Sequence, residues 1–73
     1  MIDMEDLKRM VTRSGFSEVF WERIQADRRK GGRLTFRACY AQMELEYEAE
    51  YGEPKYPSYE AFRKARERMS RHR

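Results

Sequence analysis

The sequence predicts an all-α fold, a small single domain of about four helices with the third helix central. Apolar residues recur at helical spacing in four stretches, Gly or Pro separates these stretches, and no stretch alternates apolar and polar residues as a strand would. The chain has 73 residues, so we treat residues 1–73 as one helical domain. Aromatic residues make up 14% of the chain, which argues against disorder because they supply core-forming side chains.

The N-terminal half predicts two helices, over residues 4–14 and 18–30. Asp3 is placed to cap the first helix and Gly15 to end it. Ser17 is placed to cap the second helix, with Phe16 and Trp21 at the positions of a hydrophobic staple. The glycines after Lys30 are expected to end the second helix.

The third predicted helix spans residues 36–51 and is expected to end at Gly52. On one side it carries mostly aromatic residues, namely Phe36, Tyr40, Met43, Tyr47 and Tyr51. On the opposite side it carries smaller aliphatic residues, namely Ala38, Ala41, Leu45 and Ala49. Because both sides are apolar, we expect other helices to cover both, which places this helix at the centre.

The last predicted helix spans residues 59–70 and follows a connection that contains Pro54 and Pro57. We expect Tyr56 to fold back on the core and Ser58 to cap the last helix. The inner faces predict a core that contains Leu7, Phe20, Trp21, Ile24, Phe36, Tyr40, Met43, Leu45, Tyr47 and Phe62.

The composition argues against an enzyme. Cys39 is the only cysteine and His72 the only histidine, so neither a zinc site nor a Cys-His or Ser-His-Asp apparatus is expected. We therefore expect no catalytic residue, metal, cofactor or small-molecule substrate. The single cysteine, the absence of a long apolar run and an N-terminus unlike a signal peptide predict a cytoplasmic protein without a membrane span.

Basic residues form two clusters, and both are candidate contact sites for a partner. The first cluster lies on the last helix and comprises Arg63, Lys64, Arg68 and Arg71. Such a row can bind a phosphate backbone or an acidic protein surface, but pairs such as Glu60–Lys64 and Glu67–Arg71 are also typical of a solvated helix face. The second cluster surrounds two glycines and comprises Arg28, Arg29, Lys30 and Arg33. It can hold a phosphate through backbone N–H groups, or it can simply complement the dipole of the preceding helix.

The third helix also carries four glutamates, Glu44, Glu46, Glu48 and Glu50. We interpret them as solvated or paired between helices rather than as a metal or acid–base site, because metals need more converging ligands. An acidic surface that mimics nucleic acid is the alternative. Of the tyrosines, Tyr56 and Tyr59 are the freer candidates for stacking on bases, since the others lie on the expected core face.

The C-terminal half carries an aromatic–glutamate helix ending in EYG and then the stretch YPSYEAFR, from Tyr56 to Arg63. This half resembles short uncharacterised helical proteins of phages and mobile elements, which often close with a Tyr-x-Ser-Tyr-x-x-Phe-Arg stretch. The resemblance implies an accessory, regulatory or anti-defence role rather than a particular activity.

These patterns lead to an expected function by elimination. We expect a small non-enzymatic binding module that acts by contact with a macromolecular partner, and a protein more than DNA or RNA. The alternative is a nucleic-acid-binding protein that uses the basic clusters at 28–33 and 63–73. A further hypothesis is an assembly protein that oligomerises through exposed aromatic residues.

Overall fold

The computed structural model describes the backbone of residues 4–71 and the side chains of residues 4–68. Four helices follow one another, α1 (Met4–Arg9), α2 (Arg13–Arg29), α3 (Phe36–Tyr51) and α4 (Tyr59–Arg71). The described residues contain no strand, so the predicted all-α class is confirmed. The bounds of α3 are those predicted, and α4 ends one residue beyond the prediction.

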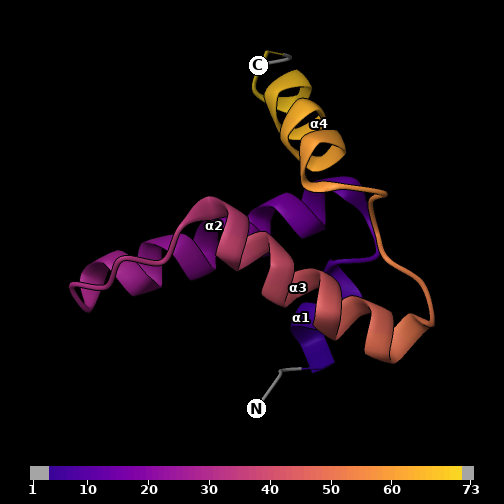
Figure 1. Cartoon of the computed structure of the whole chain (residues 1–73), viewed down its shortest axis with the longest axis horizontal. Coiled ribbons are helices and arrows are strands. Elements are labelled where there is room, and N and C mark those ends of the chain that lie inside the picture. Colours follow the sequence, from indigo (N-terminus) through magenta and orange to yellow (C-terminus); the bar gives the residue numbers. More distant parts are fainter. Residues whose placement is uncertain (1–3, 72–73) are drawn as a thin grey trace.

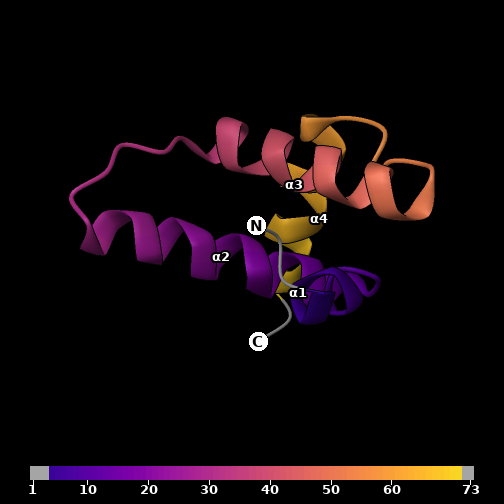
Figure 2. The same cartoon turned by 90° about the horizontal axis from the view of Figure 1, so that it is seen from below.

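The third helix contacts all three other helices, α1, α2 and α4, and α2 likewise contacts all the others. Figure 2 shows α3 along one side of the molecule, α1 and α2 along the other, and α4 crossing between these two layers. In Figure 1, α4 projects from the body in one direction and the α2–α3 loop in another. The third helix therefore contacts every other helix, as α2 does too, and all its neighbours lie on one side of it.

The predicted bounds 4–14 and 18–30 are wrong at the junction of the first two helices. The hydroxyl of Thr12, not that of Ser17, caps α2, because it accepts a hydrogen bond of 3.0 Å from the N–H of Gly15. Gly15 does not end α1 but lies in the first turn of α2, where an added Cβ would stand 1.8 Å from the carbonyl oxygen of Arg9. The sequence therefore uses glycine here so that the two helices can approach closely.

The core lies where α2, α3 and the start of α4 meet. Its buried members are Leu7, Met10, Phe16, Val19, Phe20, Ile24, Cys39, Tyr40, Met43, Tyr56 and Phe62. The ring of Phe62 lies 4.9 Å from that of Phe20 and 5.4 Å from that of Phe16, in edge-to-face geometry. Tyr56 is only 8% exposed, which confirms that the connection folds back onto the core.

Two residues predicted in the core lie at the surface instead. Leu45 is 70% exposed and Trp21 is 38% exposed. Ala41, on the same side of α3 as Leu45, is also exposed. The expectation that α3 is packed on both faces is therefore wrong, because the three other helices of this short chain all cover its aromatic face.

The connection between α3 and α4 is held by a buried carboxylate. Gly52 turns the chain at the end of α3 with a φ of 86°, a left-handed conformation that favours glycine. Glu44 is then able to accept hydrogen bonds from the N–H of Lys55 at 2.7 Å and that of Tyr56 at 2.9 Å. The hydroxyl of Tyr40 donates to the same carboxylate. Glu44 is 9% exposed and its partners lie in its own helix and in the connection, so the prediction that it is solvated or paired between helices is wrong for this residue.

Candidate functional site: an arginine set on four aromatic rings

The most unusual surface feature is the guanidinium of Arg66, which lies over four aromatic rings. Its central carbon is 5.1 Å from the ring centroid of Phe36, 5.3 Å from Trp21, 5.6 Å from Phe20 and 6.0 Å from Phe62. These distances are within the range of cation–π attraction. We call these five residues the aromatic–arginine site.

Three helices build the aromatic–arginine site. Neighbouring positions of α2 supply Phe20 and Trp21, the first residue of α3 supplies Phe36, and α4 supplies Phe62 and Arg66. Because Phe62 and Arg66 are four residues apart, they lie on the same face of α4. The ring of Trp21 meets the edge of Phe36 at a centroid distance of 5.3 Å. Each ring is thus fixed by packing between helices rather than by a loop.

The charge of Arg66 is not balanced by a carboxylate among the side chains that the structure describes. Its Nε is buried and has no hydrogen-bond partner within residues 4–68. An unpaired buried donor costs about 1–3 kcal/mol, more for a charged group. One turn earlier, Arg63 is bound by Glu60 and, at 2.6 Å, by Glu67. Arg66 therefore differs from its neighbour in carrying a charge that no carboxylate among the described side chains balances.

A second arginine sits on a ring near this site. The guanidinium carbon of Arg37, in the first turn of α3, lies 5.2 Å from the ring centroid of Tyr59. Within the described part of the chain, Arg37 also has no ion pair. The positive charge of the site is thereby extended along the start of α3.

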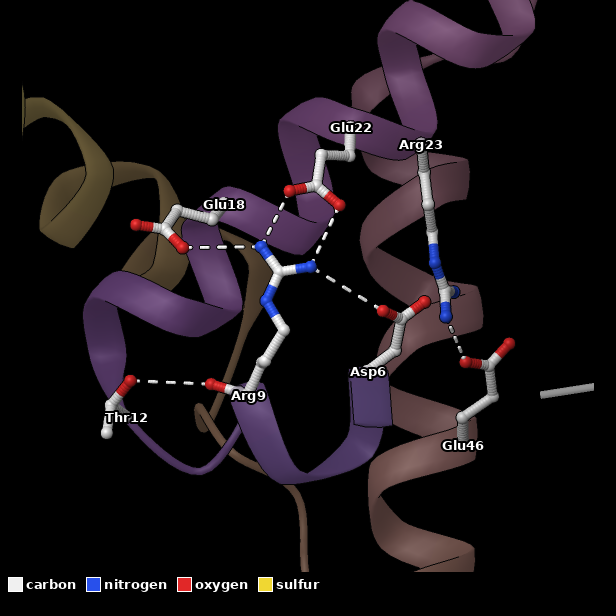
Figure 3. A network of polar contacts seen from close by, with 7 residues as sticks. All are labelled: Asp6, Arg9, Thr12, Glu18, Glu22, Arg23 and Glu46. Carbon is white, nitrogen blue, oxygen red and sulfur yellow. Dashed lines mark hydrogen bonds and ion pairs between the residues drawn. The ribbon is translucent and has the colours of Figure 1, made fainter. Parts of the chain in front are cut away.

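Two other arginines, Arg9 and Arg23, form ion pairs that join helices, as Figure 3 shows. The guanidinium of Arg9 binds Glu22 at 2.6 and 2.9 Å and Glu18 at 3.3 Å, which ties α1 to α2. The hydrogen bonds from Arg9 lower the pKa of Glu22. Arg23 binds Glu46 at 2.6 Å and ties α2 to α3. These charges stabilise the fold and are not free for a partner.

The predicted cations of α4 are only partly available. Lys64 and Arg68 are exposed and form no ion pair among the described residues. Arg63 is engaged with Glu60, so the expected Glu60–Lys64 pair is replaced by a contact one residue earlier. The side chain of Arg71 lies outside the described residues.

The basic cluster in the α2–α3 loop also contains both bound and unpaired cations. Arg28 donates to the carbonyl oxygen of Leu34 at 3.0 Å and lies 3.7 Å from the carboxylate of Asp27. Arg29, Lys30 and Arg33 are exposed, and the structure gives none of them an ion pair within residues 4–68.

The backbone of this loop does not offer a phosphate cradle. The N–H groups of Lys30, Gly31 and Gly32 donate to carbonyl oxygens of Asp27 and Arg28 at the end of α2. The N–H of Leu34 donates to the carboxylate of Asp27 at 2.9 Å. These donors are already used within the chain, which supports the interpretation that the loop only ends α2 and complements its dipole.

The two basic clusters are not brought together. Figure 1 shows the α2–α3 loop and the far end of α4 at the tips of two diverging arms. Tyr56, one of the two candidates for base stacking, is buried. Among the described residues, no group of His, Cys, Asp or Glu side chains could hold a metal ion. None of the described helices has the length and apolar character needed to cross a membrane.

Sequence reasoning did not select Arg66, and it assigned Trp21 and Phe36 to the core. The available signal was the spacing of Phe62 and Arg66, which places an arginine beside an apolar residue on one helix face. Comparisons with models of protein families, with curated proteins and with solved structures found no match to this chain.

Proposed function

We propose that the protein is a non-enzymatic binding module that acts by protein–protein contact through the aromatic–arginine site. One observation carries this proposal: Arg66 is held on four rings and has no carboxylate partner among the described side chains. A partner that presents a carboxylate beside apolar side chains would satisfy both the charge and the rings. Charge-assisted hydrogen bonds from arginine to carboxylate are among the stronger polar contacts.

The residue types of the site support a protein as the partner. Trp and Arg are enriched among the residues that dominate binding energy at protein interfaces, especially where they are already packed and partly desolvated. Trp21 is 38% exposed and Phe36 half-buried, so part of each ring is accessible. Because three helices fix these side chains, a partner would lose little free energy in ordering them.

Nucleic-acid binding is the second candidate, favoured by the exposed, unpaired cations Arg29, Lys30, Arg33, Lys64 and Arg68. Two features make it weaker. The two clusters lie on different arms of the molecule, so a single phosphate backbone would not follow both. Residues 44–53 contain five glutamates and no Lys or Arg, a charge that repels phosphate.

The proposed setting follows from the sequence alone. The resemblance of the stretch from Tyr56 to Arg63 favours an accessory or regulatory protein of a phage or mobile element. Cys39 is a free, buried thiol, and burial raises its pKa to about 11, which suits a cytoplasmic protein that does not use this thiol in chemistry.

A selection of binders from a random peptide library tests the proposal. We expect enriched peptides to share an Asp or Glu next to aromatic or aliphatic residues. Because Trp21 is the single tryptophan, its fluorescence should change when such a peptide is titrated into the protein. The variants Arg66→Met and Trp21→Ala should each weaken binding by at least about tenfold.

Arg29→Met is the matched control, since it removes an exposed arginine outside the site and should leave peptide affinity unchanged. Enrichment of no peptide, or peptides that bind Arg66→Met as tightly as the original chain, would contradict the proposal. Anisotropy titrations of labelled duplex DNA, single-stranded DNA and RNA at two salt concentrations test the second candidate. Salt-sensitive binding that Arg29→Met weakens would favour nucleic acid instead.

A further inference from the structure

The charges at the two ends of α3 oppose the helix dipole. Arg37 lies in the first turn, and Glu48 and Glu50 lie in the last, where the dipole favours the opposite signs. In α1 the order is the favourable one, with acidic residues in the first turn and basic residues in the last. The ends of α3 therefore carry charges that oppose its dipole, although Arg37 is near enough to Glu60 to help lower the pKa of that carboxyl.

The same polarity extends into the flanking segments. Residues 28–37 contain five Lys or Arg and no Asp or Glu, whereas residues 44–53 contain five Glu and no Lys or Arg. Glu44 and Glu46 are bound within the fold, but Glu48 and Glu50 are exposed and have no ion pair among the described residues. Free charge of each sign is thus left at opposite ends of one helix.

Between these ends, the outer face of α3 is apolar and uncovered. Leu45, its largest apolar side chain, is 70% exposed, and Ala38, Ala41 and Ala49 on the same side are exposed as well. In Figure 2, α1 and α2 lie along one side of α3 only. An exposed apolar face between charged ends suits docking against a helix with the reverse order of charges.

We propose that the outer face of α3 is the docking site for a second copy of this chain, whose α3 packs antiparallel to the first across a two-fold axis. In this antiparallel arrangement the charges are complementary, because the acidic end of the second α3 meets the basic end of the first. Each end of one helix then receives from the other copy a charge of the sign that its dipole favours. A two-fold contact uses one patch twice and closes on itself, so it gives a dimer and not a filament.

The spacing of the charged residues fixes the register. Arg37 and Glu48 are eleven positions apart, about three helical turns, and so lie on the same flank of α3, at the border between the outer face and Tyr59 of α4, on whose ring the Arg37 guanidinium lies. In an antiparallel pair, the same flank of each helix meets the same flank of the other, so Arg37 of one copy faces Glu48 of the other, twice. In that register, Leu45 of each copy lies beside Ala38 and Ala41 of the other, whose small side chains leave room for it.

Sedimentation velocity over a concentration series tests the dimer. We expect the original chain to shift from monomer to dimer with rising concentration, and to do so less at high salt, which screens the end charges. Leu45→Glu should raise the dimer dissociation constant at least about tenfold while circular dichroism shows an unchanged helix content, because the side chain is exposed in the monomer. A chain that stays monomeric at the highest soluble concentration would overturn the proposal.

Two charge reversals test the antiparallel register. Arg37→Glu and Glu48→Arg should each abolish the dimer, because each places like charges opposite one another twice. When the two variants are mixed in equal amounts, both contacts become attractive again and a heterodimer should form. Failure of this mixture to associate would rule out the register.

Glu50→Arg is the matched control for these reversals. It makes the same change in net charge as Glu48→Arg, but residue 50 points away from the outer face of α3, so the dimer should persist. Loss of the dimer in this variant would mean that net charge, and not the pairing of α3 with its copy, controls association.

Discussion

The two faces of α3 have the same helical spacing of apolar residues, but one face is buried and the other is exposed. On the inner face, Cys39 and Met43 have no exposed surface and Tyr40 has 7%, whereas Leu45 on the outer face is 70% exposed. Both faces are apolar, so apolar periodicity alone does not distinguish them. The difference teaches that periodicity groups residues onto a face, while the number and position of other helices decide whether that face is covered.

The glutamates of α3 make the same comparison for charged residues. Glu44 is buried and accepts hydrogen bonds from two backbone N–H groups and the hydroxyl of Tyr40, while Glu48, one turn later, is exposed. The connection after α3 returns to the inner face and supplies the donors that allow a carboxylate to be buried. Burial of Tyr40, together with its hydrogen bond to Glu44, raises the pKa of its phenol.

The largest expected effect comes from shortening one apolar side chain on each face. Met43→Ala removes a fully buried side chain, and we expect it to lower the free energy of unfolding by about 2–5 kcal/mol. Leu45→Ala should change it by no more than about 0.5 kcal/mol at concentrations where the chain is monomeric. Urea unfolding followed by circular dichroism measures both values. Equal losses would mean that α3 is packed on both sides after all.

A smaller difference is expected between the two glutamates. Glu44→Gln leaves an amide that cannot accept all three hydrogen bonds, so we expect the free energy of unfolding to fall by about 2 kcal/mol. Glu48→Gln removes an exposed charge that has no ion pair among the described residues, so it should have almost no effect at concentrations where the chain is monomeric. The same urea experiment compares them, and a larger loss in Glu48→Gln would refute the role given to Glu44.

Much of the fold could be predicted from local signals, because several helix ends are set by residues close in sequence. The hydroxyl of Thr35 accepts from the N–H of Ala38 at 3.1 Å, and that of Ser58 accepts from the N–H of Ala61 at 3.2 Å. The start of α2 was misplaced because Thr12 and Ser17 are both suitable caps. Packing favours Thr12. When α2 begins after Thr12, Gly15 can approach α1 closely, and Phe16 and Ser17 become buried residues of α2.

The candidate site was harder to predict than the fold, because it depends on contacts between helices. Arg66 is one of seven Lys or Arg residues after position 52, and its own helix does not reveal that it meets rings from α2 and α3. Glu44 was misassigned for the same reason, since its donors come from a segment beyond Gly52. A single sequence gives the spacing on each helix but not the angle at which helices meet.

The substitutions expected to disturb the structure least compare the two faces of α3 through the reactivity of a thiol on each. Burial raises the pKa of Cys39 to about 11, so at pH 8 its thiolate fraction is on the order of a hundredfold below that of a thiol with the ordinary value. Cys39 should therefore react slowly with Ellman's reagent. The thiol introduced by Ala41→Cys in a Cys39→Ala background should react at nearly the rate of a free thiol, because residue 41 is exposed on the outer face.

Both proteins in urea provide the control, since each thiol should then react at the same rate. Equal rates in the folded proteins would contradict the burial of Cys39. The rate for Ala41→Cys also bears on the proposed dimer. If a second α3 covers the outer face, this thiol should become less reactive as protein concentration rises, whereas the slow rate of Cys39 should not depend on concentration.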